Sequence, residues 1–159
     1  MKAGDILLFH RNTGFSKLIS WGCRSIYSHC AVCVNADMNL AIEAQGRVRG
    51  EDIRRMTEYD VFRVKEVYPY ELDDVVSFLV GKLNSRYDYL GVIFLGFLKL
   101  IQFKRSANKW QKKNDYFCSE LVSTAFRVGG LDLVKHIGDS VTSPADIARS
   151  EVVRRVDDE

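Results

Sequence analysis

The chain has 159 residues, of which 47% are hydrophobic and 28% are charged, so we expect residues 1–159 to form a single globular domain. Its 23 basic and 21 acidic residues leave a net charge of only +2, which does not predict a nucleic-acid partner. The apolar run from Ile6 to Phe9 is too short for a secretory signal, so we expect a cytoplasmic protein.

The first part of the chain carries the alternating patterns of a small sheet. A turn at Gly4 precedes a mostly buried strand, and an uneven helical pattern follows over residues 15–26. The next two strands are separated by the turn-forming residues 35–39, which predicts a β-hairpin. Residues 46–49 are candidates to extend the sheet, and a polar irregular stretch follows them. The predicted strands are 6–10, 27–35, 40–45 and 59–65.

After Pro69 the hydrophobic pattern becomes helical. Apolar residues form a stripe over 72–83, and the acids within 71–74 suit the first turn of a helix. Further along, 129–130 is a glycine pair typical of a helix end, and 143–144 predicts a short helix with a serine cap and proline in its first turn. Residues 151–156 are predicted to return as a last edge strand.

Residues 90–103 are apolar nearly all round. As a helix the segment spans about 21 Å, short of the ~30 Å hydrocarbon core, so it predicts a core helix or an exposed apolar face rather than a transmembrane span. The following stretch, 104–113, is basic around Trp110 and predicts either a solvated loop or a contact with anionic lipid head groups. Peripheral membrane contact through residues 90–113 is therefore one of the expected partner modes.

A cysteine opens the next predicted helix. Counted from Cys118, apolar residues recur at +3, +4, +7 and +8, so the thiol lies on the inward stripe while Glu120 and Arg127 lie outside it. Asn114 or Asp115 can serve as the N-cap, and the free N–H groups of the first turn favour a thiolate. Cys118 is therefore a candidate nucleophile, and the alternative is a small buried hydrophobe.

The four cysteines are expected to be free thiols, because no signal peptide is predicted. Cys30 and Cys33 have the spacing of a redox or zinc half-site, but side chains three apart in a strand point to opposite faces. No second half-site accompanies them, so we expect no metal. The remaining cysteine is Cys23.

A base and an orienting acid for Cys118 are predicted in the hairpin. If the hairpin centres on Ala36, His29 lies directly opposite Glu43 with Cβ atoms about 5 Å apart. A carboxylate beside an imidazole fixes its tautomer, which is the third role in a Cys-His-acid triad. The alternatives are a structural His29, and a Glu43 that pairs with an arginine, either Arg47 or Arg49. The other histidines, His10 and His136, have no acidic partner at a useful spacing and are expected to be structural.

The motifs Tyr27-Ser28-His29, Ile42-Glu43-Ala44 and Tyr116-Phe117-Cys118-Ser119-Glu120, in this order, resemble the circularly permuted papain-like amidases of the NlpC-related superfamily. The resemblance implies an α+β fold of the permuted papain type, with a small antiparallel sheet or half-barrel packed against the helix that carries the nucleophile. It also implies that Cys118 is the nucleophile, His29 the base and Glu43 the orienting group, without a cofactor.

We therefore predict a cysteine hydrolase that cleaves an amide or ester through a thioester. The Cys118 N–H would hold the oxyanion, and the candidates for further oxyanion or substrate contacts are Tyr27, Tyr116 and Ser119. Lipid-linked acyl groups and cell-wall peptides are both substrate classes implied by the resemblance, and the apolar and basic stretches over 90–113 favour the acyl class. The alternative is a non-catalytic domain that binds an acylated or peptidic ligand in the same cleft.

Overall fold

A computed structural model of the protein describes residues 1–10, 25–87 and 115–156. The predicted helix over 15–26 lies almost wholly outside the described residues, as do the segment 90–113 and Cys23. The strands are β1 (Ile6–His10), β2 (Tyr27–Asn35), β3 (Leu40–Gln45), β4 (Arg47–Asp52), β5 (Tyr59–Val64), β6 (Arg86–Tyr87), β7 (Asp115–Tyr116) and β8 (Val153–Val156). The α-helices are α2 (Leu72–Gly81), α4 (Cys118–Val128) and α5 (Pro144–Ala148), and the 3-10 helices are η1 (Ile53–Arg55) and η2 (Asp139–Val141).

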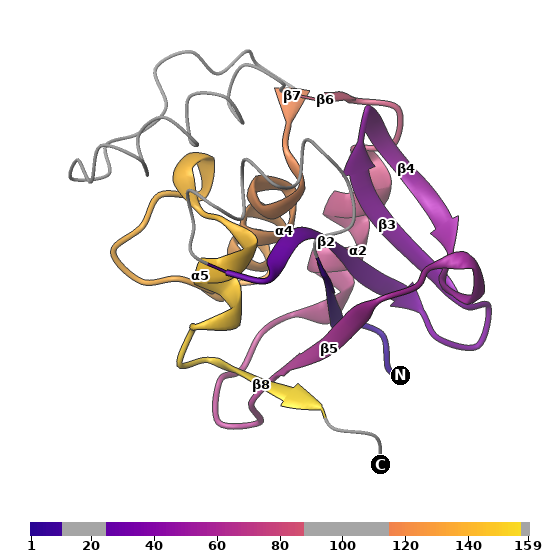
Figure 1. The fold of residues 1–159 in the computed structure, drawn as a ribbon. Helices are drawn as coiled ribbons and strands as arrows, with labels where there is room; N and C mark the ends of the chain where they lie inside the picture. Colours follow the sequence, from indigo (N-terminus) through magenta and orange to yellow (C-terminus); the bar gives the residue numbers. More distant parts are fainter. Residues whose placement is uncertain (11–24, 88–114, 157–159) are drawn as a thin grey trace.

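The architecture is a mixed α+β fold with an open sheet (Figure 1). The strand order is β7-β6-β4-β3-β2-β1-β5-β8, and all neighbours are antiparallel except the short pair β6 and β7. The predicted strands are present, and the residues expected to extend the hairpin form β4. Among the described residues, no helix has the length and apolar character needed to cross a membrane.

The main core lies between one face of the sheet and the helices. Val75 and Leu79 of α2, Leu121 of α4 and Ile147 of α5 all pack in it, and each is fully buried. The opposite face of the central strands buries a smaller cluster around Leu7. The strand pattern of β2 shows the two faces directly, because consecutive side chains alternate between the clusters.

The two cysteines of the C-x-x-C spacing fall on opposite faces, as predicted. Cys30 packs in the main core and Cys33 in the smaller cluster. Both are free and buried. Their separation across the sheet follows from the odd spacing in an extended strand, so the two sulfur atoms do not form a redox pair.

The register of the hairpin differs from the prediction. Ala31, and not His29, lies opposite Glu43, because the pairing of Asn35 with Leu40 centres the turn beyond Ala36. A bulge between Cys33 and Asn35 takes back one position of this shift. The predicted direct pairing is therefore wrong by two positions along β2. Since a shift of two keeps every side chain on its face, His29 becomes the diagonal neighbour of Glu43, and long side chains still meet at that spacing.

The helix that begins at Cys118 is also capped differently from the prediction. Its N-cap is Phe117, with extended backbone, rather than Asn114 or Asp115. The prediction that Glu120 lies outside the buried stripe is wrong, since this residue is only 2% exposed. The short helix α5 has the predicted cap: Ser143 and Asp146 form a reciprocal capping box.

Helices α4 and α2 meet end to end through backbone groups. The Glu71 N–H donates to the Gly129 carbonyl at 2.8 Å, where α4 ends and α2 begins. A Cβ atom on Gly129 would lie 2.6 Å from Val75 Cγ2 and 2.8 Å from the Glu71 oxygen. The absence of a side chain at position 129 is therefore what permits this close approach.

Candidate active site

The strands β2 and β3 separate at one end of their hairpin. Their pairing stops at Ala31 and Glu43, although β2 extends back to Tyr27 and β3 continues to Gln45. Helix α4 contacts both strands. The Cys30 backbone N–H donates to the Cys118 sulfur, so the first residue of α4 lies against the edge that β3 leaves open.

Three side chains predicted from the sequence come together at this opening. His29 Nε2 lies 2.7 Å from Glu43 Oε2, and the His29 ring is also hydrogen-bonded to Cys118. Because Glu43 occupies Nε2, Nδ1 is the ring nitrogen that remains for the thiol. The His29 side chain is 19% exposed and that of Glu43 is 6% exposed, so the cluster is largely withdrawn from water but can be reached at the histidine.

The electrostatics favour a thiolate and an imidazolium. A hydrogen bond from the Cys30 thiol, opposed by burial and assisted by His29, holds the pKa of Cys118 well below its usual range. Burial opposes the charged form of His29, but the Cys118 sulfur and Glu43 outweigh it and raise the pKa of His29 to about 10. The two shifts share one cause, because each ion of the Cys118–His29 pair stabilises the other.

Glu43 remains ionised despite its burial. Burial alone raises the pKa of its carboxyl group, but hydrogen bonds from His29 and Arg49 lower it overall. Arg49 reaches the second oxygen, with Nε 2.9 Å and Nη2 2.8 Å from Glu43 Oε1. The sequence offered a histidine and an arginine as alternative partners of Glu43. Both contact its carboxylate, His29 at Oε2 and Arg49 at Oε1.

The three predicted contacts for substrate or oxyanion have other partners. The Tyr27 hydroxyl donates to Asp60 Oδ2 at 2.5 Å, and burial together with this carboxylate raises the pKa of Tyr27 to about 12. The Tyr116 ring packs edge-on against Phe78 of α2. Ser119 is fully buried, and its hydroxyl donates to the backbone carbonyl of Thr142. None of these contacts points to an oxyanion.

A second polar cluster was missed by the sequence reasoning. His10 Nε2 lies 3.1 Å from Asp60 Oδ2, and Arg155 of β8 lies 2.8 Å from the other carboxylate oxygen. His10 therefore has an acidic partner after all. Asp60 lies far from His10 in the sequence, and the pairing of β1 with β5 brings the two residues together. Their spacing along the chain therefore did not predict the contact.

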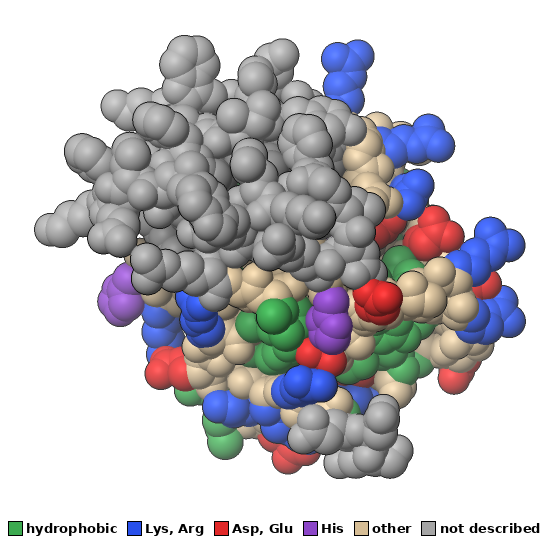
Figure 2. All heavy atoms as spheres, in the orientation of Figure 1, with side chains coloured by type: hydrophobic (Ala, Val, Ile, Leu, Met, Phe, Trp, Pro, Cys, Tyr) green, Lys and Arg blue, Asp and Glu red, His purple; other side chains and the backbone are tan. Residues whose placement is uncertain are grey.

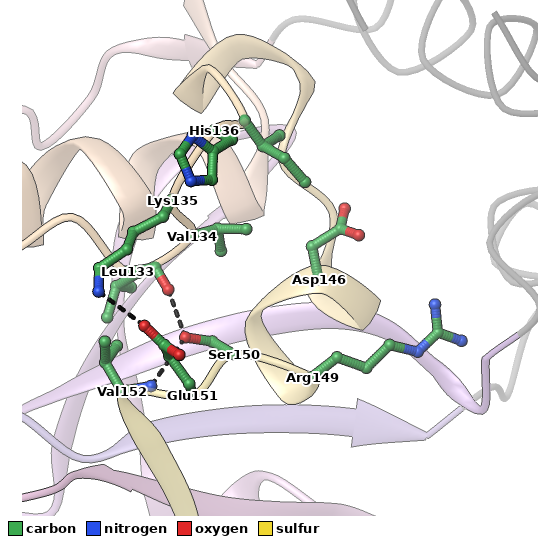
Figure 3. A pocket seen from close by; sticks show the side chains of 10 residues that line it. Leu133, Val134, Lys135, His136, Asp146, Arg149, Ser150, Glu151 and Val152 are labelled. Carbon is green, nitrogen blue, oxygen red and sulfur yellow. Dashed lines mark hydrogen bonds and ion pairs between the residues drawn. The ribbon is translucent and has the colours of Figure 1, made fainter. Parts of the chain in front are cut away.

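A cavity of about 380 Å³ lies beside α5, away from the three clustered side chains of Cys118, His29 and Glu43 (Figure 3). Lys135 and Arg149 are among the residues that line it, and Lys135 forms a 2.6 Å ion pair with Glu151 at its edge. The lining contains none of the three clustered side chains. The cavity is therefore not the substrate site of the cysteine cluster.

One face of the described part of the molecule carries charges of both signs. On the face in Figure 2, basic and acidic side chains lie interspersed around the part of the molecule that the structure describes. This agrees with the net charge of +2. The described residues on this face show no large single-sign field of the kind that attracts nucleic acid.

The fold and the cluster together define an α+β protein with a cysteine at a helix N-terminus and a histidine and a glutamate on an adjacent hairpin. No family model and no curated protein sequence matches the chain. Its structure is similar to the crystal structure of metalloprotein yiiX from Escherichia coli O157:H7, a DUF1105 protein, with a TM-score of 0.75 and 18% identity over 99% of this chain and 97% of that one. At this identity the likeness shows the fold alone.

This comparison corrects the predicted family. The chain resembled permuted papain-like amidases in its sequence motifs, but the solved structure reported above is a DUF1105 metalloprotein, and no family model matches the chain. The motifs that suggested that family are only a few residues long. Short runs around a histidine, an acid and a cysteine do not carry enough information to assign a family, although they did mark side chains that meet in the structure.

Proposed function

We propose that the protein is a cysteine hydrolase that cleaves an amide or ester bond through a thioester intermediate. The observation that supports this most directly is the position of His29, which contacts Cys118 on one side and lies 2.7 Å from the Glu43 carboxylate on the other. A nucleophile beside a base, with the base oriented by an acid, is the arrangement that nucleophilic catalysis requires. The position of Cys118 at the start of α4 adds support, because the helix dipole favours a thiolate there.

In the proposed reaction the proton of the Cys118 thiol resides on His29, and the thiolate attacks the carbonyl carbon of the substrate. The carbonyl oxygen becomes negative and is stabilised by the free N–H groups at the start of α4, that of Cys118 first. His29 then gives its proton to the leaving amine or alcohol as the thioester forms. In the second half His29 takes a proton from water, the resulting hydroxide attacks the thioester, and Cys118 leaves as the thiolate. Glu43 keeps the proton of the ring on Nε2 and stabilises the imidazolium.

The yiiX protein, which has a similar structure, is a metalloprotein. We therefore ask whether the side chains of this chain include a set of metal ligands. Within the described residues, no set of three or more His, Cys, Asp and Glu side chains lies close enough together to bind a metal ion. Two donors such as His10 and Asp60 do not complete a site of the usual four ligands. The described residues thus do not fit a metal centre, and the proposed steps use none.

For the substrate we propose an acyl or lipid-like amide or ester, with peptides of the cell wall as the competing class. This preference depends on the apolar and basic residues 90–113, which lie outside the described residues. Co-sedimentation with anionic vesicles at low salt tests the membrane part of the proposal, and an absence of binding under those conditions would contradict it.

The central test measures hydrolysis of a panel of amides and esters by the wild type and by Cys118→Ala. We expect the variant to lose all activity that the wild type shows. Iodoacetamide labelling near neutral pH, followed by peptide mapping, adds an assay that needs no substrate. Cys118 should be alkylated faster than Cys33, His29→Ala should reduce the difference, and His136→Asn, a change at an exposed histidine outside the cluster, should preserve it. Equal and slow labelling of both cysteines would instead support a non-catalytic binding domain.

A further inference from the structure

The carboxylate of Glu43 is held on both of its oxygens. Oε2 lies 2.7 Å from His29 Nε2, and Oε1 receives Arg49 Nε at 2.9 Å and Nη2 at 2.8 Å. Arg49 is directly opposite Glu43 in the pairing of β3 with β4, so the backbone register sets the contact. Because the arginine holds one oxygen and the histidine contacts the other, the plane of the carboxylate has one orientation, which directs Oε2 at the histidine.

Arg49 is itself held in place by its neighbours. Its Nη2 donates to Gln45 Oε1 at 2.7 Å and lies 3.6 Å from Glu51 Oε2. Gln45 comes from β3, the strand of Glu43, and Glu51 comes from β4, the strand of Arg49. The two strands lie side by side in Figure 1. The Arg49 side chain is 41% exposed, yet its guanidinium group binds the Glu43 oxygen that His29 leaves unused. Its link to the thiol of Cys118 therefore runs through Glu43 and His29.

We propose that Arg49 is a positioning residue, which acts through Glu43 to hold His29 in the orientation that activates Cys118. The inference rests on the proposed function, because it assigns a role within the same site. It adds a fourth member to the cluster and explains how a glutamate with several rotatable bonds keeps a single geometry beside the histidine. Lysine does not replace such a residue, because an ammonium group lacks the planar fork.

Positioning and simple charge effects predict opposite results when Arg49 is removed. The positive charge of Arg49 competes with His29 for Glu43, so if charge alone mattered, its loss would make His29 more basic. If Arg49 positions the carboxylate, its loss lets Glu43 rotate toward water, and His29 becomes less basic. Among the described residues, the other groups that face His29 are Cys118 of α4 and the Phe9 ring of β1, and they are unchanged in either case.

The experiment measures the pKa of the His29 ring by NMR in the wild type, Arg49→Met, Arg49→Lys and Arg47→Met. We expect both Arg49 variants to lower it by about one unit, which corresponds to a tenfold weaker preference for the imidazolium. Arg47→Met is the matched control, because Arg47 is an exposed residue of β4 that lies opposite Gln45 rather than Glu43. A value for Arg49→Met that equals or exceeds that of the wild type overturns the inference, as does an unchanged value for Arg49→Lys.

Failure of the inference can be distinguished from failure of the proposed function. The NMR titration reports on Arg49 whether or not the protein is an enzyme, whereas hydrolysis and its loss in Cys118→Ala report on the function. In an active protein we expect Arg49→Met and Arg49→Lys to move the basic limb of the kcat/KM profile to lower pH by about one unit, in line with the shift in the pKa of His29. The conservative lysine variant also guards against a loss of folding in the methionine variant.

Discussion

The junction of α4 with α2 gives a prediction that can be worked out atom by atom. In Gly129→Ala the new Cβ would lie 2.6 Å from Val75 Cγ2 and 2.8 Å from the Glu71 oxygen. The Glu71 oxygen cannot move freely, because it accepts the Val75 N–H at 3.2 Å while the Glu71 N–H is bonded to the Gly129 carbonyl. The backbone of Gly129 has φ of −73°, which alanine adopts without strain, so the cost is steric. Overpacking of this kind costs roughly 1–3 kcal/mol, and we expect about 2 kcal/mol here.

The matched control is Gly81→Ala at the end of α2, where a Cβ meets nothing within 4 Å. Alanine there should be neutral or stabilise the protein by up to about 1 kcal/mol through helix propensity. Urea unfolding followed by circular dichroism measures both variants. At a typical slope near 2 kcal/mol/M, Gly129→Ala should lower the midpoint by about 1 M with little change in slope. If it unfolds at the same urea concentration as Gly81→Ala, the reasoning about this junction is wrong.

The remaining predictions concern the cysteine cluster. The pKa of Cys118 is lowered, so its thiolate is already present below the pH at which an ordinary thiol ionises. The pKa of His29 is raised to about 10, so the imidazolium persists until the pH approaches 10. The profile of kcat/KM should therefore be bell-shaped, with a basic limb near pH 10, and a basic limb near the ordinary histidine value would contradict the ion pair. Cys30→Ala removes a hydrogen bond to the thiolate, so the labelling profile of Cys118 should move to higher pH, whereas Cys33→Ala on the other face should leave it in place. Tyr27→Phe should lower the free energy of unfolding by about 1 kcal/mol through the lost bond to Asp60. It should keep kcat/KM for hydrolysis within about twofold, and a large loss of kcat/KM would restore Tyr27 as an oxyanion donor.

Patterns within single segments predicted much of the fold. The alternation in β2, β3 and β5 and the helical stripe of α2 were readable because each element buries one face, which fixes its period. The cap of α5 was readable because Ser143 and Asp146 satisfy each other's backbone groups locally. The start of α4 was not predicted correctly: both polar candidates for its N-cap precede Phe117, which caps through its backbone conformation alone.

Relations between segments were less accessible. The side chains of His29 and Glu43 do meet, but through a diagonal and not a direct pairing, since no sequence pattern marked the centre of the turn or the bulge near Asn35. The contact of His10 with Asp60 and the contribution of Cys30 to the thiolate depend on β1, β5 and α4 folding against β2. The family was also beyond reach, because motifs of a few residues constrain local geometry and leave ancestry open.

Cys118 lies at the opening between β2 and β3, and its thiol is therefore reactive only in the folded chain. In an unfolded chain the sulfur lacks the Cys30 N–H, the His29 ring and the helix terminus, and it returns to the pKa of an ordinary thiol. During synthesis the hairpin emerges well before the helix, so the sulfur acquires its reactivity on docking, as the last of the three groups to arrive. Labelling of Cys118 at mildly acidic pH thus reports how much of the chain has completed its long-range assembly.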